Sequence, residues 1–251
     1  MLKDSIETIE AGAVQAPAPV VEISGARFTW PGAKGFTLTI DAFSLPRRER
    51  ILLIGPSGSG KSTFLSLLAG INVPSEGKIS ILGTDIARLG SAARDHFRAE
   101  HIGIIFQMFN LLPYGSVIDN VVLPLSFARQ RRRRVERTGQ EPEARRLLQS
   151  LGLSPGDYEG TAAASLSVGQ QQRVACARAL IGRPELIIAD EPTSSLDRDS
   201  QLAFLDLLFA EVEHEGGTLI MVSHDHSLAP RFDRAVRLDE ISRTSRNGGT
   251  P

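Results

Sequence analysis

Apolar positions along the chain fall into short continuous runs as well as longer stretches with helical spacing. Residues 51–54 (ILLI) and 186–189 (LIIA) are continuous runs of four small or apolar residues, which is typical of short strands buried in a parallel sheet. Residues 64–69 (FLSLLA) are apolar and compatible with a helix that soon follows the first of these strands. This pattern predicts an α/β fold.

The pattern changes in the middle of the chain. Between Gln107 and the segment LSVGQQQR at 166–173, short apolar strands give way to helix-like stretches that prolines interrupt, at positions 113, 124, 142 and 155. We therefore expect a helical segment between the two strand runs. With 251 residues, 41% of them apolar, the chain is long enough for one main domain that carries an inserted lobe.

A glycine-rich loop lies between the first strand run and the helix that follows it. Residues 55–63 read GPSGSGKST and satisfy the pattern G-x-x-x-x-G-K-[ST]. Glycines let the backbone approach phosphate oxygens closely, the start of a helix favours an anion, and the lysine supplies a positive charge. The sequence therefore predicts a phosphate-binding loop rather than a plain glycine turn, formed by Gly55, Pro56, Ser57, Gly58, Ser59, Gly60, Lys61, Ser62 and Thr63, with Ser62 as a magnesium ligand.

Two carboxylates follow the second strand run. Asp190 and Glu191 come at its carboxyl end, which is where open α/β sheets bind their ligands. We expect Asp190 to hold magnesium through water, and Glu191 to polarise the attacking water as a general base. The two acids could instead cap the next element, but the glycine loop upstream favours the catalytic interpretation.

Seven segments resemble, in the same order, the motifs of the ATP-binding cassette (ABC) ATPases. They are Trp30, GPSGSGKST at 55–63, Gln107, LSVGQQQR at 166–173, LIIADE at 186–191, SSLD at 194–197 and His224. The resemblance implies a P-loop NTPase (RecA-like) core with an inserted α-helical subdomain and an N-terminal antiparallel β region. The ABC ATPase domain would span residues 20–240, with its helical subdomain at about 110–183, between a flexible lead-in at 1–19 and a polar tail at 241–251.

The resemblance also implies an ATPase that uses ATP and Mg²⁺, and it gives roles to single residues. Trp30 would stack on adenine, Gln107 would touch magnesium and the attacking water, and His224 would hold the γ-phosphate and orient Glu191. Considered singly, each has a plainer interpretation: a packing tryptophan, a solvated glutamine and a histidine that caps a turn. Their occurrence in one order favours the ATPase roles.

The segment at 166–173 resembles the signature loop of these ATPases. Ser167, Gly169 and Gln170 would close over the γ-phosphate of ATP bound to a second copy, and Asp197 would communicate across the same interface. The resemblance therefore implies a head-to-tail homodimer, in which each ATP lies between the phosphate loop of one copy and the signature loop of the other.

Two positions depart from the family pattern. Val168 replaces the first glycine of the usual LSGGQ, which puts a β-branched residue where the backbone is normally unrestricted. Because Ser167 and Gly169 remain, we expect phosphate contact to survive. Arg48 stands where a glycine is usual, in a turn remote from the phosphates, so this change puts little of the function in doubt.

Net charge and composition limit the classes of partner and the compartment that we expect for this chain. The formal net charge of −1 gives no electrostatic reason to expect nucleic acid as a partner. No stretch approaches the roughly eighteen continuous apolar residues of a membrane-spanning helix, and the N-terminal segment does not resemble a secretory signal. The single Cys176 suits a reducing compartment, and on its predicted helix we expect a small buried hydrophobe rather than a reactive thiol.

Six arginines are concentrated between residues 129 and 137, in the segment ARQRRRRVER. A run of this kind is most often a solvated helix face. The alternative is contact with lipid headgroups or with the cytoplasmic face of a partner, because basic residues near an anionic leaflet each add to the attraction.

Residues 102–125, IGIIFQMFNLLPYGSVIDNVVLPL, resemble the lipoprotein-releasing and macrolide-exporting branch of the family. This branch implies a separate transmembrane permease, with the ATPase peripheral to the cytoplasmic face of the inner (plasma) membrane and coupled through the surface near Phe109, Leu111, Leu112 and Tyr114. Two alternatives stay open: a cell-division type ATPase that signals through a permease-like partner, and a soluble cassette ATPase of DNA repair or translation. The single phosphate loop and the lack of a CxxC pair disfavour the latter.

Overall fold

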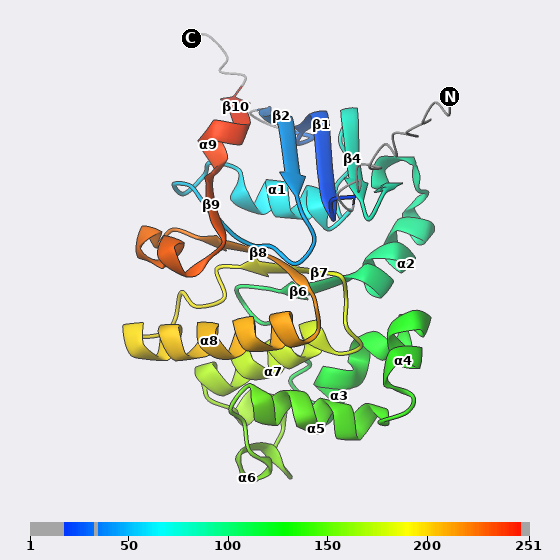
Figure 1. The fold of residues 1–251 in the computed structure, drawn as a ribbon, viewed down its shortest axis with the longest axis vertical. Helices are drawn as coiled ribbons and strands as arrows, with labels where there is room; N and C mark the ends of the chain where they lie inside the picture. Colours follow the sequence, from blue (N-terminus) through cyan, green and yellow to red (C-terminus); the bar gives the residue numbers. More distant parts are fainter. Residues whose placement is uncertain (1–17, 33–34, 247–251) are drawn as a thin grey trace, which may run out of the picture.

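A parallel sheet forms the centre of the molecule (Figure 1). The computed structural model describes residues 18–32 and 35–246, so most of the lead-in predicted for residues 1–19 lies outside the described residues. The apolar runs of the sequence lie in β3 and β7 and are buried, as predicted. All neighbouring strands of this sheet are parallel, and their order is β6 (Ile102–Ile105), β7 (Leu186–Asp190), β8 (Thr218–Ser223), β3 (Arg50–Ile54) and β9 (Arg234–Arg237).

A second sheet is antiparallel, as the resemblance implies. Its strand order is β10 (Ser242–Arg246), β2 (Phe36–Leu45), β1 (Val21–Thr29), β4 (Glu76–Ile81) and β5 (Thr84–Asp85). The polar tail predicted for residues 241–251 is therefore wrong for residues 242–246. Their backbone groups pair with β2, and this pairing does not require apolar side chains. Residues 247–251 lie outside the described part of the chain.

Helix α1 (Lys61–Leu68) is buried between the two sheets. Ile51 and Leu53 of β3 join one apolar core, together with Phe64 of α1 and side chains of the antiparallel sheet. Leu52 and Ile54, which point to the other face of β3, join a second core with residues of α7 and α8. Because both faces of the parallel sheet are covered, its strands have the continuous apolar runs seen in the sequence.

A helical lobe lies between β6 and β7 in the sequence, at the end of the molecule away from the antiparallel sheet (Figure 1). Its helices are α3 (Val117–Val122), α4 (Arg129–Val135), α5 (Gln140–Ser150), α6 (Pro155–Tyr158) and α7 (Val168–Leu180). The remaining helices are α2 (Ser91–His101), α8 (Arg198–His214) and α9 (Leu238–Ile241), with short 3₁₀ turns at Ile86–Arg88, Leu123–Ser126, Ala163–Ser165 and His226–Arg231. Cys176 is buried in α7, as expected, and none of the described helices is long and apolar enough to cross a bilayer.

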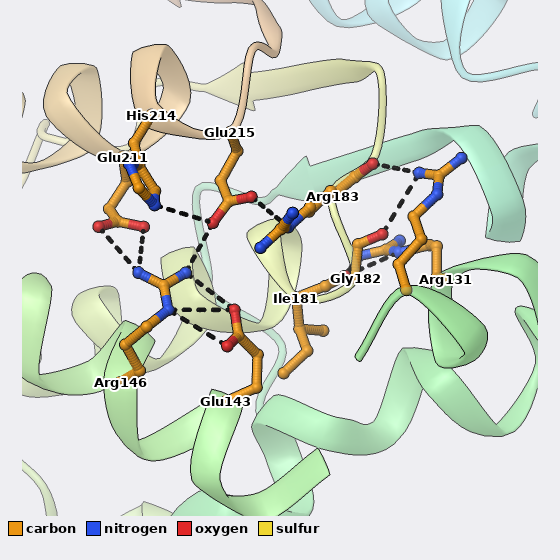
Figure 2. A network of polar contacts seen from close by, with 10 residues as sticks. Arg131, Glu143, Arg146, Ile181, Gly182, Arg183, Glu211, His214 and Glu215 are labelled. Atoms are coloured by element: carbon orange, nitrogen blue, oxygen red, sulfur yellow. Dashed lines mark hydrogen bonds and ion pairs between the residues drawn. The ribbon is translucent and has the colours of Figure 1, made fainter. Parts of the chain in front are cut away.

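An ion-pair network joins the helical lobe to α8 (Figure 2). Arg146 of α5 lies 2.8 Å from the Glu143 carboxylate, 3.2 Å from that of Glu211 and 2.7 Å from that of Glu215. The three carboxylates are almost fully buried, and the hydrogen bond that Arg146 donates to Glu143 raises the pKa of Arg146 above its ordinary value. Since removing one partner of a buried ion pair leaves an uncompensated charge, this network holds α5 against α8.

The arginine run at 129–137 is only in part the solvated helix face that such runs usually form. Arg131 is 2% exposed and donates to backbone carbonyls at the end of α7, while Arg134 pairs with Glu185 at 2.7 Å. The remaining arginines of the run are exposed: Arg129, Arg132, Arg133 and Arg137. Arg131 and Arg134 therefore stabilise the fold, because they donate to carbonyl and carboxylate groups that lie far away in the sequence.

Arg48 has a φ of +63°, in the left-handed region that favours glycine. Its N–H donates to Thr218 Oγ1 at 2.8 Å, which holds the backbone in place. We expect Arg48→Gly to raise the free energy of unfolding by about 0.5–1 kcal/mol, because relief of this strain exceeds the entropy that glycine loses on folding. Urea denaturation measures the change. Arg47→Gly, at an exposed neighbour outside the left-handed region, is the control and should be destabilising; a loss of stability in both variants would contradict the prediction.

Candidate functional site

The phosphate-loop residues connect the end of β3 to the start of α1. Gly58 and Gly60 have φ angles of +77° and +101°, so the loop depends on the conformational freedom of glycine. A Cβ on Gly60 would lie 3.1 Å from the Phe36 ring and 3.3 Å from a Leu38 methyl carbon. The antiparallel sheet therefore packs directly on the loop, and a side chain at this position would require the Phe36 ring or Leu38 to shift slightly.

Lys61 is the first residue of α1 and is almost buried. Its ammonium donates to the carbonyls of Gly55 at 2.7 Å and Pro56 at 3.0 Å. These two hydrogen bonds hold the positive charge over the loop, beside the free N–H groups of the helix start. An anion that enters the loop meets one charged side chain and several backbone donors.

A cavity of about 640 Å³ opens at the loop, a size typical of ligand sites. Most of the sequence-predicted residues of the nucleotide site meet there: it is lined by Trp30, Phe36, Ser57, Gly58, Gly60, Lys61, Ser62, Thr63, Gln107, Asp190 and Glu191. Gly55, Pro56 and Ser59 are not part of this lining; the first two supply the carbonyls that hold Lys61, and the Ser59 hydroxyl is buried beneath the loop.

Ser62 and Asp190 lie at one wall of this cavity, with the Ser62 hydroxyl 3.4 Å from Asp190 Oδ2. Burial raises the pKa of Asp190 above its ordinary value, and the neighbouring Glu191 raises it further. A partly desolvated carboxylate beside a hydroxyl is a pair of oxygen ligands of the kind that Mg²⁺ prefers. The donor chemistry of these two residues fits the predicted magnesium site.

Glu191 follows β7, and His224 follows the neighbouring strand β8. Their side chains meet at the carboxyl edge of the sheet, with His224 Nδ1 3.1 Å from Glu191 Oε2. Glu191 itself has a φ of +45°, which is strained for a residue with a side chain, and its N–H donates to Val222 O at 3.1 Å. Glu191 lines the cavity, whereas His224 lies outside this lining and contacts Glu191 from a neighbouring hollow.

Trp30, just after β1, forms another wall of the cavity. Its indole N–H donates to Thr63 Oγ1 at 3.1 Å, and the Phe28 ring lies edge-on to it at 5.3 Å. The ring is 44% exposed, so a planar base could stack on it. Phe36 lies nearby as a second aromatic residue; the sequence analysis missed it because it belongs to no motif and is brought in by the pairing of β1 with β2.

The signature residues lie apart from this lining. Ser167 caps α7: its hydroxyl accepts from the Gln170 N–H at 3.3 Å, and Gln170 Oε1 accepts from the Ser167 N–H at 2.9 Å. Val168 is the first residue of the helix and has no left-handed backbone, which explains how the loop accepts a β-branched residue there. Neither Ser167, Gly169 nor Gln170 lines the cavity of its own chain.

Arg178 of α7 is a functional-site residue that the sequence analysis did not single out. Its guanidinium donates to the carbonyl of Asn110 at 2.7 Å and to that of Phe109. Phe109 and Asn110 have φ angles of +58° and +50°, so Arg178 holds a strained turn two residues after Gln107. The helix that begins at the signature loop therefore also supports the segment that carries Gln107. In the sequence, the only indication of this role is a charged residue, Arg178, within the mostly apolar stretch RVACARAL.

Similarity to known proteins covers most of the chain. Residues 38–194 match the family model described as ABC transporter. The chain is 45% identical over 192 residues to the uncharacterized ABC transporter ATP-binding protein YbbA of Escherichia coli K12, which covers 76% of this chain and 81% of that protein. It is 41% identical over 191 residues to the lipoprotein-releasing system ATP-binding protein LolD of Cereibacter sphaeroides, with coverages of 76% and 82%.

Two further matches differ in what they cover. The macrolide export ATP-binding/permease protein MacB of Rhodopirellula baltica is 41% identical over 214 residues, which are 84% of this chain but only 29% of that protein. The structure of the ATP-binding cassette MJ0796, a dimer in a post-hydrolysis state bound to ADP and Pi, superimposes with a TM-score of 0.75 at 30% identity. It covers 92% of this chain and 100% of the MJ0796 chain.

Proposed function

Because this chain belongs to the ABC transporter family, as an ATP-binding and ATP-hydrolysing subunit close to LolD and MacB, we propose that it powers an exporter or a lipoprotein-release type system. In this proposal two copies act as a head-to-tail dimer, coupled to a separate permease at the cytoplasmic face of the inner membrane. The observation that carries it is the assembly of the phosphate loop, Asp190, Glu191 and Trp30 around one cavity.

Substrate binding follows from the walls of the cavity. Trp30 stacks on the adenine ring, and Lys61 and the backbone donors of residues 57–63 hold the phosphates. Ser62, Asp190 and Gln107 are the residues that would hold Mg²⁺, which when bound neutralises charge on the phosphate oxygens. Among the residues that the structure describes, Lys61 is the only cationic side chain of the lining, so we assign to it the charge that meets the β and γ phosphates.

Glu191 acts as the general base. An ionised carboxylate only accepts hydrogen bonds, so in this proposal the Nδ1–H of His224 donates a hydrogen bond to Glu191 Oε2, with 3.1 Å between the two atoms. The second oxygen of Glu191 then remains free to accept a proton from the attacking water. The water oxygen bonds to the γ-phosphorus while the bond from this phosphorus to the β–γ bridging oxygen breaks and ADP leaves. His224 is thus a positioning residue for Glu191, and the strained backbone of Glu191 keeps the carboxylate at the edge of the cavity.

The signature loop completes the site of the opposite copy. Ser167 and Gly169 do not line the cavity of their own chain. Ser167 and Val168 are exposed at the start of α7, and a helix start suits an anion. The similar MJ0796 cassette is a dimer. These two observations support a composite site in which α7 of one copy points at the γ-phosphate held by the other.

Replacing Ser167 with arginine tests this arrangement. Ser167→Arg puts a bulky cation into the interface and leaves the chain's own phosphate loop intact. We expect ATP binding to single chains to persist, while ATP-driven dimerisation fails and ATPase activity falls at least about tenfold. Gln149→Arg, on the exposed face of α5, is the matched control and should keep full activity. Normal hydrolysis by Ser167→Arg would show that the head-to-tail arrangement is wrong.

The proposed permease contact lies in an apolar groove of about 650 Å³ between α2, β6 and the helical lobe, which Ile104, Phe106, Leu123, Pro124 and Phe127 help to line. The sequence predicts this contact at the surface near Phe109, Leu111, Leu112 and Tyr114. Of these residues, Tyr114 is 83% exposed and Phe109 is buried. The Phe109 side chain therefore does not form part of the contact surface. An exposed apolar groove beside the Gln107 segment suits a partner helix with apolar anchors.

A further inference from the structure

Helix α4 is fixed firmly in the helical lobe although it is only seven residues long. At its first turn, the buried Glu100 of α2 accepts from the Gln130 N–H at 2.9 Å and the Arg131 N–H at 3.3 Å. A carboxylate in this place satisfies free N–H groups of the helix start. The first turn of α4 is therefore held by a side chain from another helix.

Arg131 fixes the opposite face of α4. Its guanidinium is buried and donates to the carbonyl of Ile181 at 2.9 Å (Figure 2). It also donates to the carbonyl of Ala179 at 3.0 Å. These carbonyls belong to the end of α7, where backbone acceptors lack intrahelical donors. Burial lowers the pKa of Arg131 to about 10, so the group still carries its charge at neutral pH. Held on both sides, α4 presents its remaining face in one orientation.

That remaining face is an array of arginines without partners. Arg129, Arg132 and Arg133 have the i, i+3 and i+4 spacing that places side chains on one helix face, and Arg137 follows two residues after the helix end. All four are exposed. Ion pairs in this lobe use other arginines, such as Arg134, and among the described residues no carboxylate lies within ion-pair distance of these four side chains. We name them the α4 arginine surface.

This arrangement has an electrostatic cost in the chain alone. Like charges at i, i+3 and i, i+4 repel each other, and Arg129 adds a positive charge near the helix start, where the macrodipole is also positive. Every other basic group that fixes α4 is compensated by carbonyls or by Glu185. An anionic partner would offset this repulsion. Because α4 is already fixed in the lobe, binding would cost little backbone entropy, and only the arginine side chains would have to be ordered.

The surroundings of the α4 arginine surface favour a lipid leaflet as that partner. Phe127, 67% exposed, comes two residues before Arg129, and arginines beside an exposed aromatic side chain are typical of interfacial binding. Phe127 also lines the groove proposed for the permease, so the array lies beside the side that would face the membrane. Forked guanidinium donors match the geometry of phosphate oxygens.

We propose that the α4 arginine surface, formed by Arg129, Arg132, Arg133 and Arg137, binds the anionic phosphate headgroups of the membrane. The position of the membrane in this proposal rests on the permease coupling proposed above, but binding to lipid does not require the permease. The formal net charge of the chain is −1, so attraction to an anionic leaflet has to come from a local array and not from the molecule as a whole.

Co-sedimentation of the full chain with vesicles tests the proposal. The vesicles contain either phosphatidylcholine alone or phosphatidylcholine with about one third phosphatidylglycerol. We expect the wild-type chain to bind the anionic vesicles preferentially and to lose this binding at high salt. Changing all four arginines to glutamine should weaken binding at least tenfold, since each basic residue that reaches an anionic surface contributes about fivefold, equivalent to about 1 kcal/mol.

The matched control removes the same charge elsewhere. Arg27, Arg47, Arg88 and Arg243 are exposed and lie outside the helical lobe, so their change to glutamine should leave most of the vesicle binding. Both variants should keep wild-type ATPase activity in solution, since none of these residues lines the nucleotide cavity; this reading separates a failure of lipid binding from a failure of the proposed ATPase function. Equal vesicle binding by wild type, the α4 variant and the control, or no preference for anionic vesicles, would overturn the proposal and leave an acidic segment of the permease as the partner.

Discussion

Replacement of Glu191 by glutamine is expected to lower ATP turnover by about 10²-fold or more, the range associated with loss of a general base. The amide keeps the size of the side chain and can still contact His224, but it cannot accept the proton of the attacking water. ATP binding should remain, because Lys61 and the glycine loop are unchanged. Steady-state phosphate release measures the turnover, and calorimetric ATP titration measures the binding.

Glu213→Gln provides the control for this experiment. Glu213 is an exposed carboxylate on α8 and does not line the nucleotide cavity, so its neutralisation should leave turnover unchanged. If Glu191→Gln hydrolysed ATP at nearly the wild-type rate, the role of general base would have to move to another group, although the cavity and its nucleotide could remain as described.

Replacement of Lys61 by alanine is expected to weaken ATP binding by about ten- to a hundredfold, which corresponds to the loss of one charge-assisted hydrogen bond to the phosphates. In the described part of the chain, Lys61 is the only cationic side chain that lines the cavity. The variant should also lose ATPase activity. Titration with ATP, followed by calorimetry, gives the change in affinity directly.

Lys78→Ala is the matched control, because Lys78 lies exposed on β4 and outside the cavity. Its affinity for ATP should equal that of the wild-type chain. An unchanged affinity in Lys61→Ala itself would mean that the loop at 55–63 does not hold the phosphates, and the assignment of the nucleotide to this cavity would then be lost.

The meeting of Lys61, Asp190 and Glu191 at one cavity could be predicted from the sequence, because each lies in a short recognisable segment. The glycine loop, Asp190 and Glu191 each follow an apolar run that identifies the strand end, and the parallel sheet then brings the strand ends together. The strain at Glu191, with its φ of +45°, could not be predicted, since it depends on a hydrogen bond to the neighbouring strand.

The supporting residues could not be predicted, because their partners are backbone groups far along the chain. Arg131 donates to carbonyls 48 and 50 residues away, and Arg178 donates to one 68 residues away. A sequence pattern indicates a charged residue but not a distant carbonyl that needs a donor. Strand β10 could not be predicted for the same reason. Its side chains are polar, and only its backbone groups, which pair with β2, make it a strand.

Whether two copies share each ATP can be decided from the molar mass of Glu191→Gln with and without ATP. Light scattering after size-exclusion chromatography should give the mass of one chain without nucleotide and twice that mass with ATP, because binding is retained and hydrolysis no longer separates the copies. The double variant Glu191→Gln with Ser167→Arg should bind ATP and stay at the mass of one chain. A single-chain mass for ATP-bound Glu191→Gln, or an ATP-driven dimer of the double variant, would contradict the shared site.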